Sequence, residues 1–532
     1  MKQAKFRRLM MLALVLCVLP LVSLSATGGA EADDGEDAMH LEWAVNSSPD
    51  TLFAPTYFNS PIGSGIMGLI YDNLLVYTGD NELEESLAVS WEATSPTTYR
   101  YTVREDAVFS DGSPVTVEDV AFSFRFHNDP DFGSRQAFLF EDVESVEIDG
   151  NDVVIELSEP DSSWKFIPSH MGAYILKQSH VEANFDSYGT PETLPIGSGP
   201  YMVDEFVPDS HVSLVRNPNY WGEPPVFDTI RFPVIPDDQT RFLAMQSGDI
   251  DGTFNVPPAA MNQWEEVSEI VQATAFIFRG LTIDMEDDPF DDIHVRRALY
   301  YATDRESIVS GLFAGTAVPA TTLDPPEMFE GVLSDSEVEQ GYDDLAVFEF
   351  DLERAREELA QSKVPDGFSM TINVPDGSRA AIDITQAVEE TWEQIGIDVD
   401  LNLMPGGPRF QLILDHGPSL GVQIIGNLPD VPDPAILPYQ YYHSSQAAVN
   451  GNNSSNLRVE EIDELLESAL TATDPAESAR LAMEAQILAS EQVPIIPILW
   501  SDFIFAVRDG WTMGPINGSS VTNTFVRAIN PE

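Results

Sequence analysis

Hydrophobic residues between 368 and 403 recur first with the period of a strand and then with the period of a helix. Every second residue is apolar at 368–374 and again at 399–403, which predicts two strands. Between them, the apolar residues of 384–395 share one helical face. A strand, a helix and a strand in this order form a βαβ unit, so we predict that the two strands run parallel.

The first half of the chain mixes the same two periods. Thr116-Val-Glu-Asp119 has the form of a capping box, and the apolar residues of 117–124 lie on one face of the helix that it predicts. Alternating apolar residues predict strands at 99–104, 153–157, 212–214 and 230–234. The chain is therefore expected to be of the α/β class.

Helix signals continue toward the carboxyl end. Helical faces are predicted at 295–302 and 462–470, and Thr303-Asp-Arg-Glu306 and Asp474-Pro475 have the residue types that begin helices. No period of 20 to 50 residues repeats, so a solenoid is not indicated. At roughly 150 residues per unit, the 532 residues suggest two to four folding units.

The amino terminus has the three parts of an export signal. An apolar run from Leu9 to Leu24, interrupted by Pro20, is followed by small residues, and it is preceded by four basic residues, Lys2, Lys5, Arg7 and Arg8. The run is too short for a membrane span, which needs about 20 apolar residues. We predict a signal peptide at 1–25, with cleavage as late as residue 32, followed by a disordered acidic linker at 26–38.

The single cysteine, Cys17, lies inside the apolar run and follows Leu16. Lipoprotein signals require a small residue before the cysteine, so we expect no lipid anchor. After cleavage the chain has no thiol and hence no disulfide and no cysteine-bound metal. The exported protein is therefore expected outside the cytoplasm, in the periplasm or an equivalent compartment.

Acidic residues dominate the charge. The chain has 88 Asp and Glu against 26 Lys and Arg, a formal net charge of −62, and removal of the leader makes it more negative. Nucleic acid is excluded as an expected partner, because it requires a basic surface. With 43% hydrophobic residues the chain can still bury large cores. We interpret the acids as a solvated surface suited to high salt, where screening removes self-repulsion.

Patterns typical of enzymes occur without their required context. Gly417-Pro-Ser-Leu-Gly421 matches a nucleophile elbow with Ser419 as nucleophile, but an elbow needs a strand before the serine and a helix after it, and here the order is reversed. Gly63-Ser-Gly65-Ile-Met-Gly68 matches a dinucleotide fingerprint without a buried strand before it. The eight histidines have no metal-ligand spacing. We expect no catalytic residue, no cofactor and no metal.

The strongest pattern is a series of blocks in the middle of the chain. Ile196-Gly-Ser-Gly-Pro-Tyr201 predicts a tight chain reversal and supplies no nucleophile, base or metal ligand. With the blocks at 215–222 and 244–251 it resembles the signature region of the family 5 extracellular solute-binding proteins, the dipeptide- and oligopeptide-binding components of ABC importers. Further resembling blocks lie at 87–92, 109–114, 118–120, 289–292, 295–299, 304–306 and 430–434.

The resemblance implies a periplasmic-binding-protein fold, with two α/β lobes around a central ligand cleft and two crossings of the chain between them. We place the crossings near Arg279 to Asp284 and near Trp500 to Ala506. Lobe I then comprises 39–284 and 501–532, and lobe II comprises 285–500.

The resemblance also implies ligand contacts. Asp430 matches an aspartate that pairs with the ligand's ammonium group in peptide-binding members; otherwise it caps a turn in a proline-rich loop. Asn427 stands where the family often has tryptophan, which removes an aromatic wall from the pocket. Arg379 is the candidate for a ligand carboxylate, or else a surface cation. Tyr57 and Phe58, in an early loop, are expected to stack on the ligand or simply to pack.

These observations predict a non-catalytic receptor that closes on a peptide-like solute and docks, as a monomer, to an ABC permease. The alternatives within this class are an oligosaccharide, a nickel chelate or another cationic solute. The alternative of a different class is a secreted serine hydrolase that uses Ser419.

Overall fold

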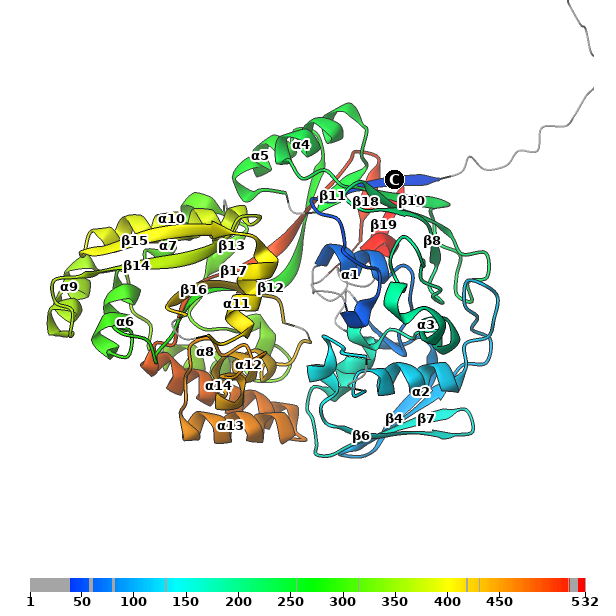
Figure 1. Cartoon of the computed structure of the whole chain (residues 1–532), viewed down its shortest axis with the longest axis horizontal. Coiled ribbons are helices and arrows are strands. Elements are labelled where there is room, and N and C mark those ends of the chain that lie inside the picture. Colours follow the sequence, from blue (N-terminus) through cyan, green and yellow to red (C-terminus); the bar gives the residue numbers. More distant parts are fainter. Residues whose placement is uncertain are drawn as a thin grey trace, which may run out of the picture. The chain divides into compact units, whose positions relative to one another are not determined.

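Strands from both ends of the chain meet in one large sheet of the computed structural model (Figure 1). The structure describes residues 39–56, 61–78, 82–129, 132–254, 256–313, 315–417, 420–429, 431–514, 516 and 525–531. The predicted signal peptide and linker lie outside these residues, as do Tyr57, Phe58, Ser419 and Asp430. Within the described ranges, no helix is long and apolar enough to cross a membrane.

The large sheet has the strand order β15-β14-β16-β12-β17-β11-β1-β10-β9-β8, with β13 paired to β17. These strands are β1 (His40–Ala44), β8 (Tyr201–Val207), β9 (His211–Arg216), β10 (Thr229–Pro233), β11 (Gly252–Phe254), β12 (Glu269–Ile283), β13 (Ala317–Pro319), β14 (Phe368–Pro375), β15 (Ile397–Met404), β16 (Val422–Asn427) and β17 (Ile495–Val507).

The predicted βαβ unit is confirmed. β14 and β15 run parallel in register from Phe368 opposite Ile397 to Pro375 opposite Met404, and α10 (Arg379–Glu393) connects them. Trp392 of α10 is fully buried, and its indole Nε1 donates to the hydroxyl of Thr303 at 3.1 Å. The helix therefore covers the parallel pair with an apolar face, and the one polar atom of the Trp392 side chain has a hydrogen-bond partner.

A smaller four-stranded sheet lies in the first half. Its order is β4-β5-β7-β6, all antiparallel, with β4 (Ala88–Ser95), β5 (Thr98–Val103), β6 (Val143–Asp149) and β7 (Asp152–Leu157). Helix α2 (Val117–Phe126) packs on it. The capping box predicted at 116–119 is present, because Thr116 and Asp119 each accept a hydrogen bond from the other's backbone N–H.

The remaining predicted helices are also present, and their caps lie at the expected segments. Asp304 is the N-cap of α7 (Arg305–Leu312), whereas the neighbouring Thr303 donates its hydroxyl to Leu299 O. Asp474 caps α14 (Pro475–Gln492), with Pro475 at its first position. The other described α-helices are α1 (Pro61–Met67), α3 (Gln178–Asn184), α4 (Asp238–Ser247), α5 (Met261–Trp264), α6 (Ile293–Tyr301), α8 (Asp335–Asp343), α9 (Leu352–Gln361), α11 (Gly406–Leu414), α12 (Ile436–Tyr442) and α13 (Glu460–Thr471).

Three hydrophobic clusters form the main cores. The first core surrounds Trp43 and the strands β8 to β10, and the second core surrounds the βαβ unit and Trp392. The third core lies between α2 and the four-stranded sheet. Short hairpins complete the described strands, β2 (Leu75–Tyr77) with β3 (Leu83–Glu85) and β18 (Trp511–Met513) with β19 (Ile529–Pro531).

The segment 196–201 has a packing role. The backbone of Ile70 lies against Gly197 and Gly199, and a Cβ at these glycines would come within 2.0 Å and 2.6 Å of its atoms. Gly199 N donates to Ile70 O at 2.9 Å. Glycine is therefore needed here because two backbone segments touch.

Candidate functional site

The antiparallel strands β12 and β17 connect the first core to the second (Figure 1). On β12, Ala273 and Ala275 belong to the first core, and Leu281 belongs to the second. On β17 the order is reversed, because Leu499 lies in the second core and Phe503 in the first. Both strands therefore cross from one core to the other, close to the two segments that the sequence indicates.

Arg279 lies on β12 within this crossing. It pairs with Gly426 of β16 on one side and with Leu499 of β17 on the other. Its side chain is partly exposed, its Nε atom is buried without a hydrogen-bond partner, and burial lowers the pKa of the guanidinium from its ordinary value. The crossing therefore carries a cation at the boundary between the two cores.

The motif at 430–434 follows β16 and reaches the first half of the chain. Asp430 is outside the described residues, but its neighbour Val431 is almost fully buried, and it belongs to the third core with the residues of α2 and the four-stranded sheet. Asn427, at the end of β16, still pairs with Phe278 of β12. Within a few residues, the chain thus passes from the large sheet to a different core.

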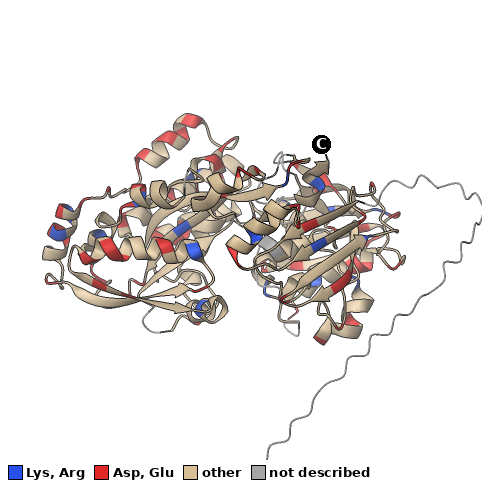
Figure 2. Cartoon of the chain, turned by 90° about the horizontal axis from the view of Figure 1, so that it is seen from above, with Lys and Arg blue, Asp and Glu red and all other residues tan. Residues whose placement is uncertain are grey.

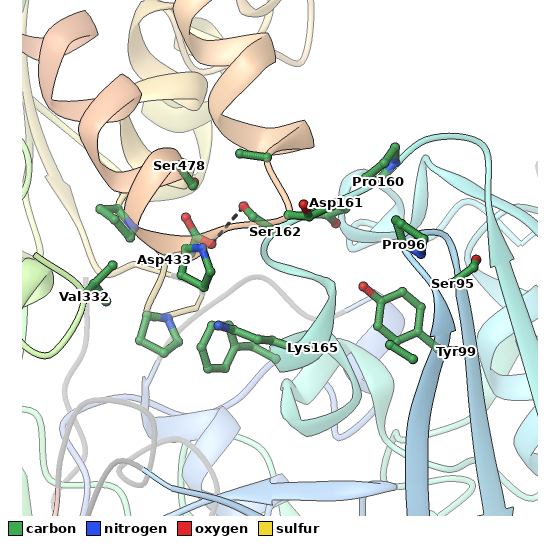
Figure 3. Close-up of a pocket in the computed structure, with 17 residues that line it drawn as sticks. Ser95, Pro96, Tyr99, Pro160, Asp161, Ser162, Lys165, Val332, Asp433 and Ser478 are labelled. Atoms are coloured by element: carbon green, nitrogen blue, oxygen red, sulfur yellow. Dashed lines mark hydrogen bonds between the residues drawn. The ribbon is translucent and has the colours of Figure 1, made fainter.

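Asp433 fixes the same loop by polar contacts (Figure 3). Its Oδ2 accepts a hydrogen bond from the hydroxyl of Ser162 at 3.0 Å, and its Oδ1 accepts one from Ala435 N at 2.9 Å. The backbone N–H of Ser162 donates to Leu470 O of α13 at 2.7 Å. Burial raises the pKa of Asp433. The hydrogen bonds offset part of the cost of burying the carboxylate.

A cavity of about 490 Å³ lies beside these contacts. Asp161 lines it, and burial raises the pKa of this carboxyl to about 6, with smaller contributions from the charges of Asp433 and Asp142. Lys165 also lines the cavity, and its ammonium lies 4.7 Å from the ring centre of Phe166. The full lining is Ala93, Ser95, Pro96, Tyr99, Pro160, Asp161, Ser162, Lys165, Phe166, Val332, Pro432, Asp433, Pro434, Ala472, Thr473, Pro475 and Ser478.

Arg379, the sequence-based candidate for a ligand carboxylate, begins α10 at the protein surface. Its side chain is 77% exposed and forms an ion pair with Asp383, with Nη2 and Oδ1 2.6 Å apart. The pair raises the pKa of Arg379, through the hydrogen bond to Asp383 first. The guanidinium thus already has a carboxylate partner in the same helix.

The sequence matches a known family over most of this architecture. The model of the bacterial extracellular solute-binding proteins, family 5, matches residues 82–448. The chain belongs to this family. The match includes β12, Arg279 and the loop that contains Asp433.

Known proteins support the assignment. The glutathione-binding protein GsiB of Salmonella typhi is 26% identical over 473 residues, which are 87% of this chain and 89% of GsiB. The periplasmic binding protein DppA of Helicobacter pylori, solved in complex with the peptide STSA, has a TM-score of 0.81 at 20% identity, and the match covers 93% of this chain and 99% of DppA. The oligopeptide-binding protein AppA of Bacillus subtilis, solved with a nonapeptide, has a TM-score of 0.79 at 21% identity. This match covers 93% of this chain and 99% of AppA. These structures show the two-lobed periplasmic-binding-protein fold.

As a family 5 solute-binding protein, the chain is an extracytoplasmic transport receptor and not an enzyme. The order of elements around the pattern at 417–421 agrees with this. Helix α11 precedes the pattern and strand β16 follows it, which is the reverse of the order in a nucleophile elbow. In the described part of the chain, no group of three or more His, Cys, Asp or Glu residues is placed to hold a metal ion.

Sequence reasoning did not propose Arg279, Ser162 or Asp433 as individual site residues, although Arg279 marks a predicted crossing and Asp433 lies in the block 430–434. The available signal for Arg279 is that it is the lone charged residue in the segment 273–283. The contact between Ser162 and Asp433 has no local signal, because the two residues are far apart in sequence and meet only in the folded chain.

Proposed function

We propose that this family 5 receptor binds peptides in its interlobe cleft and delivers them to the permease of an ABC importer. Its fold is that of DppA and AppA, which were solved with peptides, and its relative GsiB is a glutathione-binding protein. We further propose that it is exported without a lipid anchor, acts as a monomer and does not bind nucleic acid. Lobe I is assigned to 39–284 and 501–532, and lobe II to 285–500.

The anchoring of the loop at 430–434 is the observation that carries this proposal. Asn427, before the loop, belongs to the large sheet, whereas Val431 and Asp433, inside it, contact the third core and Ser162. A loop held by both parts of the chain is a suitable carrier for a ligand contact in a cleft that closes.

Asp430 is the proposed partner of the ligand's ammonium group. In a cleft from which water is excluded, a carboxylate facing an ammonium makes a charge-assisted hydrogen bond and disfavours ligands that lack the cation. Asn427, Arg379, Tyr57 and Phe58 complete the proposed set of contacts. With asparagine in place of an aromatic residue at 427, the side-chain pocket has one wall fewer.

Isothermal titration calorimetry with free and N-acetylated tri- and tetrapeptides tests the proposal. Asp430→Asn keeps the shape but leaves the ligand cation unpaired, at a cost of roughly 2–5 kcal/mol, so affinity for free-amine peptides should fall by orders of magnitude. N-acetylated peptides should bind weakly to both forms. Asp209→Asn is a matched control, because Asp209 is exposed in a turn with a φ of 58°, which asparagine also adopts.

The alternatives make different predictions in the same experiment. Unchanged binding of free-amine peptides by Asp430→Asn would contradict the peptide proposal and favour a neutral solute such as an oligosaccharide. Ser419→Ala should change neither binding nor any turnover, whereas a serine hydrolase would lose activity.

A further inference from the structure

The partly exposed Arg279 lacks the side-chain hydrogen-bond partners that the buried arginines have. Arg296, Arg305 and Arg409 each donate to backbone carbonyls, with distances of 2.7 Å to Phe290 O, 2.6 Å to Ala320 O and 2.8 Å to Asn373 O. In the part of the chain that the structure describes, the side chain of Arg279 has no hydrogen bond and no ion pair. Its Nε–H is buried without an acceptor, which is costly, and its other donors are free to bind a solute.

The absence of a partner for the Arg279 side chain is unexpected in a chain so rich in acidic residues. With 88 acidic residues against 26 basic ones, carboxylates are available for nearly every cation, and surface arginines such as Arg100, Arg379 and Arg480 pair with them. Arg279 nevertheless stands on β12 between Gly426 of β16 and Leu499 of β17 without such a pair. Among the described residues, no carboxylate pairs with its guanidinium.

The residue opposite Arg279 leaves room for the guanidinium. A Cβ added to Gly426 would lie 2.8 Å from Nη1 of Arg279, closer than real Cβ atoms come to a neighbouring atom. The absence of a side chain at 426 therefore allows the guanidinium to lie across β16. Asn427, the next residue, is one of the proposed ligand contacts and immediately precedes the ligand loop.

We propose that Arg279 binds an anionic group of the transported solute, which for a peptide is a carboxylate. This inference rests on the proposed function, because it uses the same interlobe site, and it adds that the preferred solute is anionic at one end. The planar guanidinium can donate two parallel hydrogen bonds to a carboxylate. The solute would thereby supply the hydrogen-bond partner that the guanidinium lacks within the protein.

The inference assigns the carboxylate to a different arginine from the one that the sequence indicates. Arg379 is exposed and already paired with Asp383, so a ligand would have to compete with an existing ion pair in water. Arg279 has no such competitor, and its backbone is paired with β16 on one side and β17 on the other. A ligand anion therefore gains more from Arg279 than from Arg379.

Calorimetry with trialanine and its C-terminal amide tests the assignment on the full mature chain. The wild type should bind the free acid at least tenfold more tightly than the amide. Arg279→Gln should weaken binding of the acid by about 30-fold or more and leave binding of the amide nearly unchanged, so that the preference disappears. Arg279→Lys keeps the charge but loses the paired donors, and it should restore part of the preference.

Two further variants control for folding and for net charge. Gly426→Ala leaves Arg279 in place but moves its guanidinium, and it should reduce the preference for the acid without changing the net charge. Arg297→Gln removes a cation of α6 that contacts the ring of Phe348, 5.9 Å away, and should leave the preference unchanged. Circular dichroism melting of each variant separates lost folding from lost binding.

The results also separate this inference from the proposed function. Peptide binding with equal affinity for acid and amide, or with a preference that Arg379→Gln removes and Arg279→Gln does not, would overturn the inference and leave the peptide receptor intact. If no peptide binds, gluconate and glucose serve as the second pair. If the protein prefers gluconate to glucose and the preference depends on Arg279, the inference is supported and the peptide proposal is contradicted. If the protein binds both equally, or binds neither, the inference is overturned as well.

Discussion

The hydroxyl of Ser162 donates a 3.0 Å hydrogen bond to Oδ2 of Asp433, a residue 271 positions away in the chain. Asp433 belongs to the loop that carries the proposed ligand contact, and Ser162 precedes a short 3₁₀ helix of the first half, Trp164–Ser169. This bond therefore holds the loop at 431–434 against the first half of the chain, next to Val431 of the third core.

Replacing Ser162 by alanine should destabilise the protein. Ser162→Ala leaves one oxygen of the buried Asp433 carboxylate without its donor, at a cost of about 1–3 kcal/mol in the free energy of unfolding. The backbone bond from Ser162 N to Leu470 O is retained, so the variant isolates the side-chain contact. Urea unfolding measures the change. Ser310→Ala, whose exposed hydroxyl bonds only within its own helix, should stay within about 0.5 kcal/mol of the wild type, and an equal effect of both variants would contradict the prediction.

Asp161 should make stability depend on pH. Its pKa is raised from 3.8 to about 6 in the folded protein, chiefly by burial, so the folded state binds more protons than the unfolded state between these values. Stability contributed by this group is therefore present below about pH 4 and is lost as the pH rises to about 6, by roughly 1–3 kcal/mol.

The variant Asp161→Asn isolates this contribution. Asparagine keeps the oxygen that accepts from Ser163 N but does not titrate. The difference in unfolding free energy between pH 4.5 and pH 7 should be smaller in the variant than in the wild type, as measured by urea unfolding in 2 M potassium chloride. Identical pH profiles would show that the carboxyl titrates normally.

Salt should stabilise the protein. Acidic residues are spread over the described chain, with few basic residues between them (Figure 2). Between 0.1 M and 2 M salt the screening length falls from about 10 Å to below 3 Å, which weakens the repulsion among these charges. The melting temperature should therefore rise with potassium chloride concentration. A flat or falling melting temperature would leave the excess of acids without a role in stability.

Ligand binding should close the cleft and raise stability. At a ligand concentration of one hundred times the dissociation constant, binding to the folded state adds about 2.7 kcal/mol. The melting temperature should rise, and small-angle X-ray scattering should show a smaller radius of gyration with ligand. Superimposable scattering curves with and without a saturating ligand would argue against hinge closure.

The candidate site was only partly predictable. The family motif indicates Asp430 and Asn427, because short blocks of sequence keep their order along the chain. The same approach selects Arg379 for a carboxylate, and the structure places that residue at the surface beside Asp383. An arginine that pairs within its own helix and one that has no partner look alike in sequence, because the difference lies in what surrounds them.

By itself, the sequence determined the local elements of this protein. The parallel pair β14 and β15 follows from alternating residues and an intervening helix, and the capping box at Thr116 follows from groups three residues apart. These features depend on neighbours along the chain, so their pattern is visible without a fold. The tertiary structure alone decided that Ser162 meets Asp433, that β12 and β17 cross between two cores, and that no described carboxylate pairs with Arg279. The physical reason is that burial and ion pairing depend on which residues are close in space. In these cases the neighbours in space are far apart in sequence.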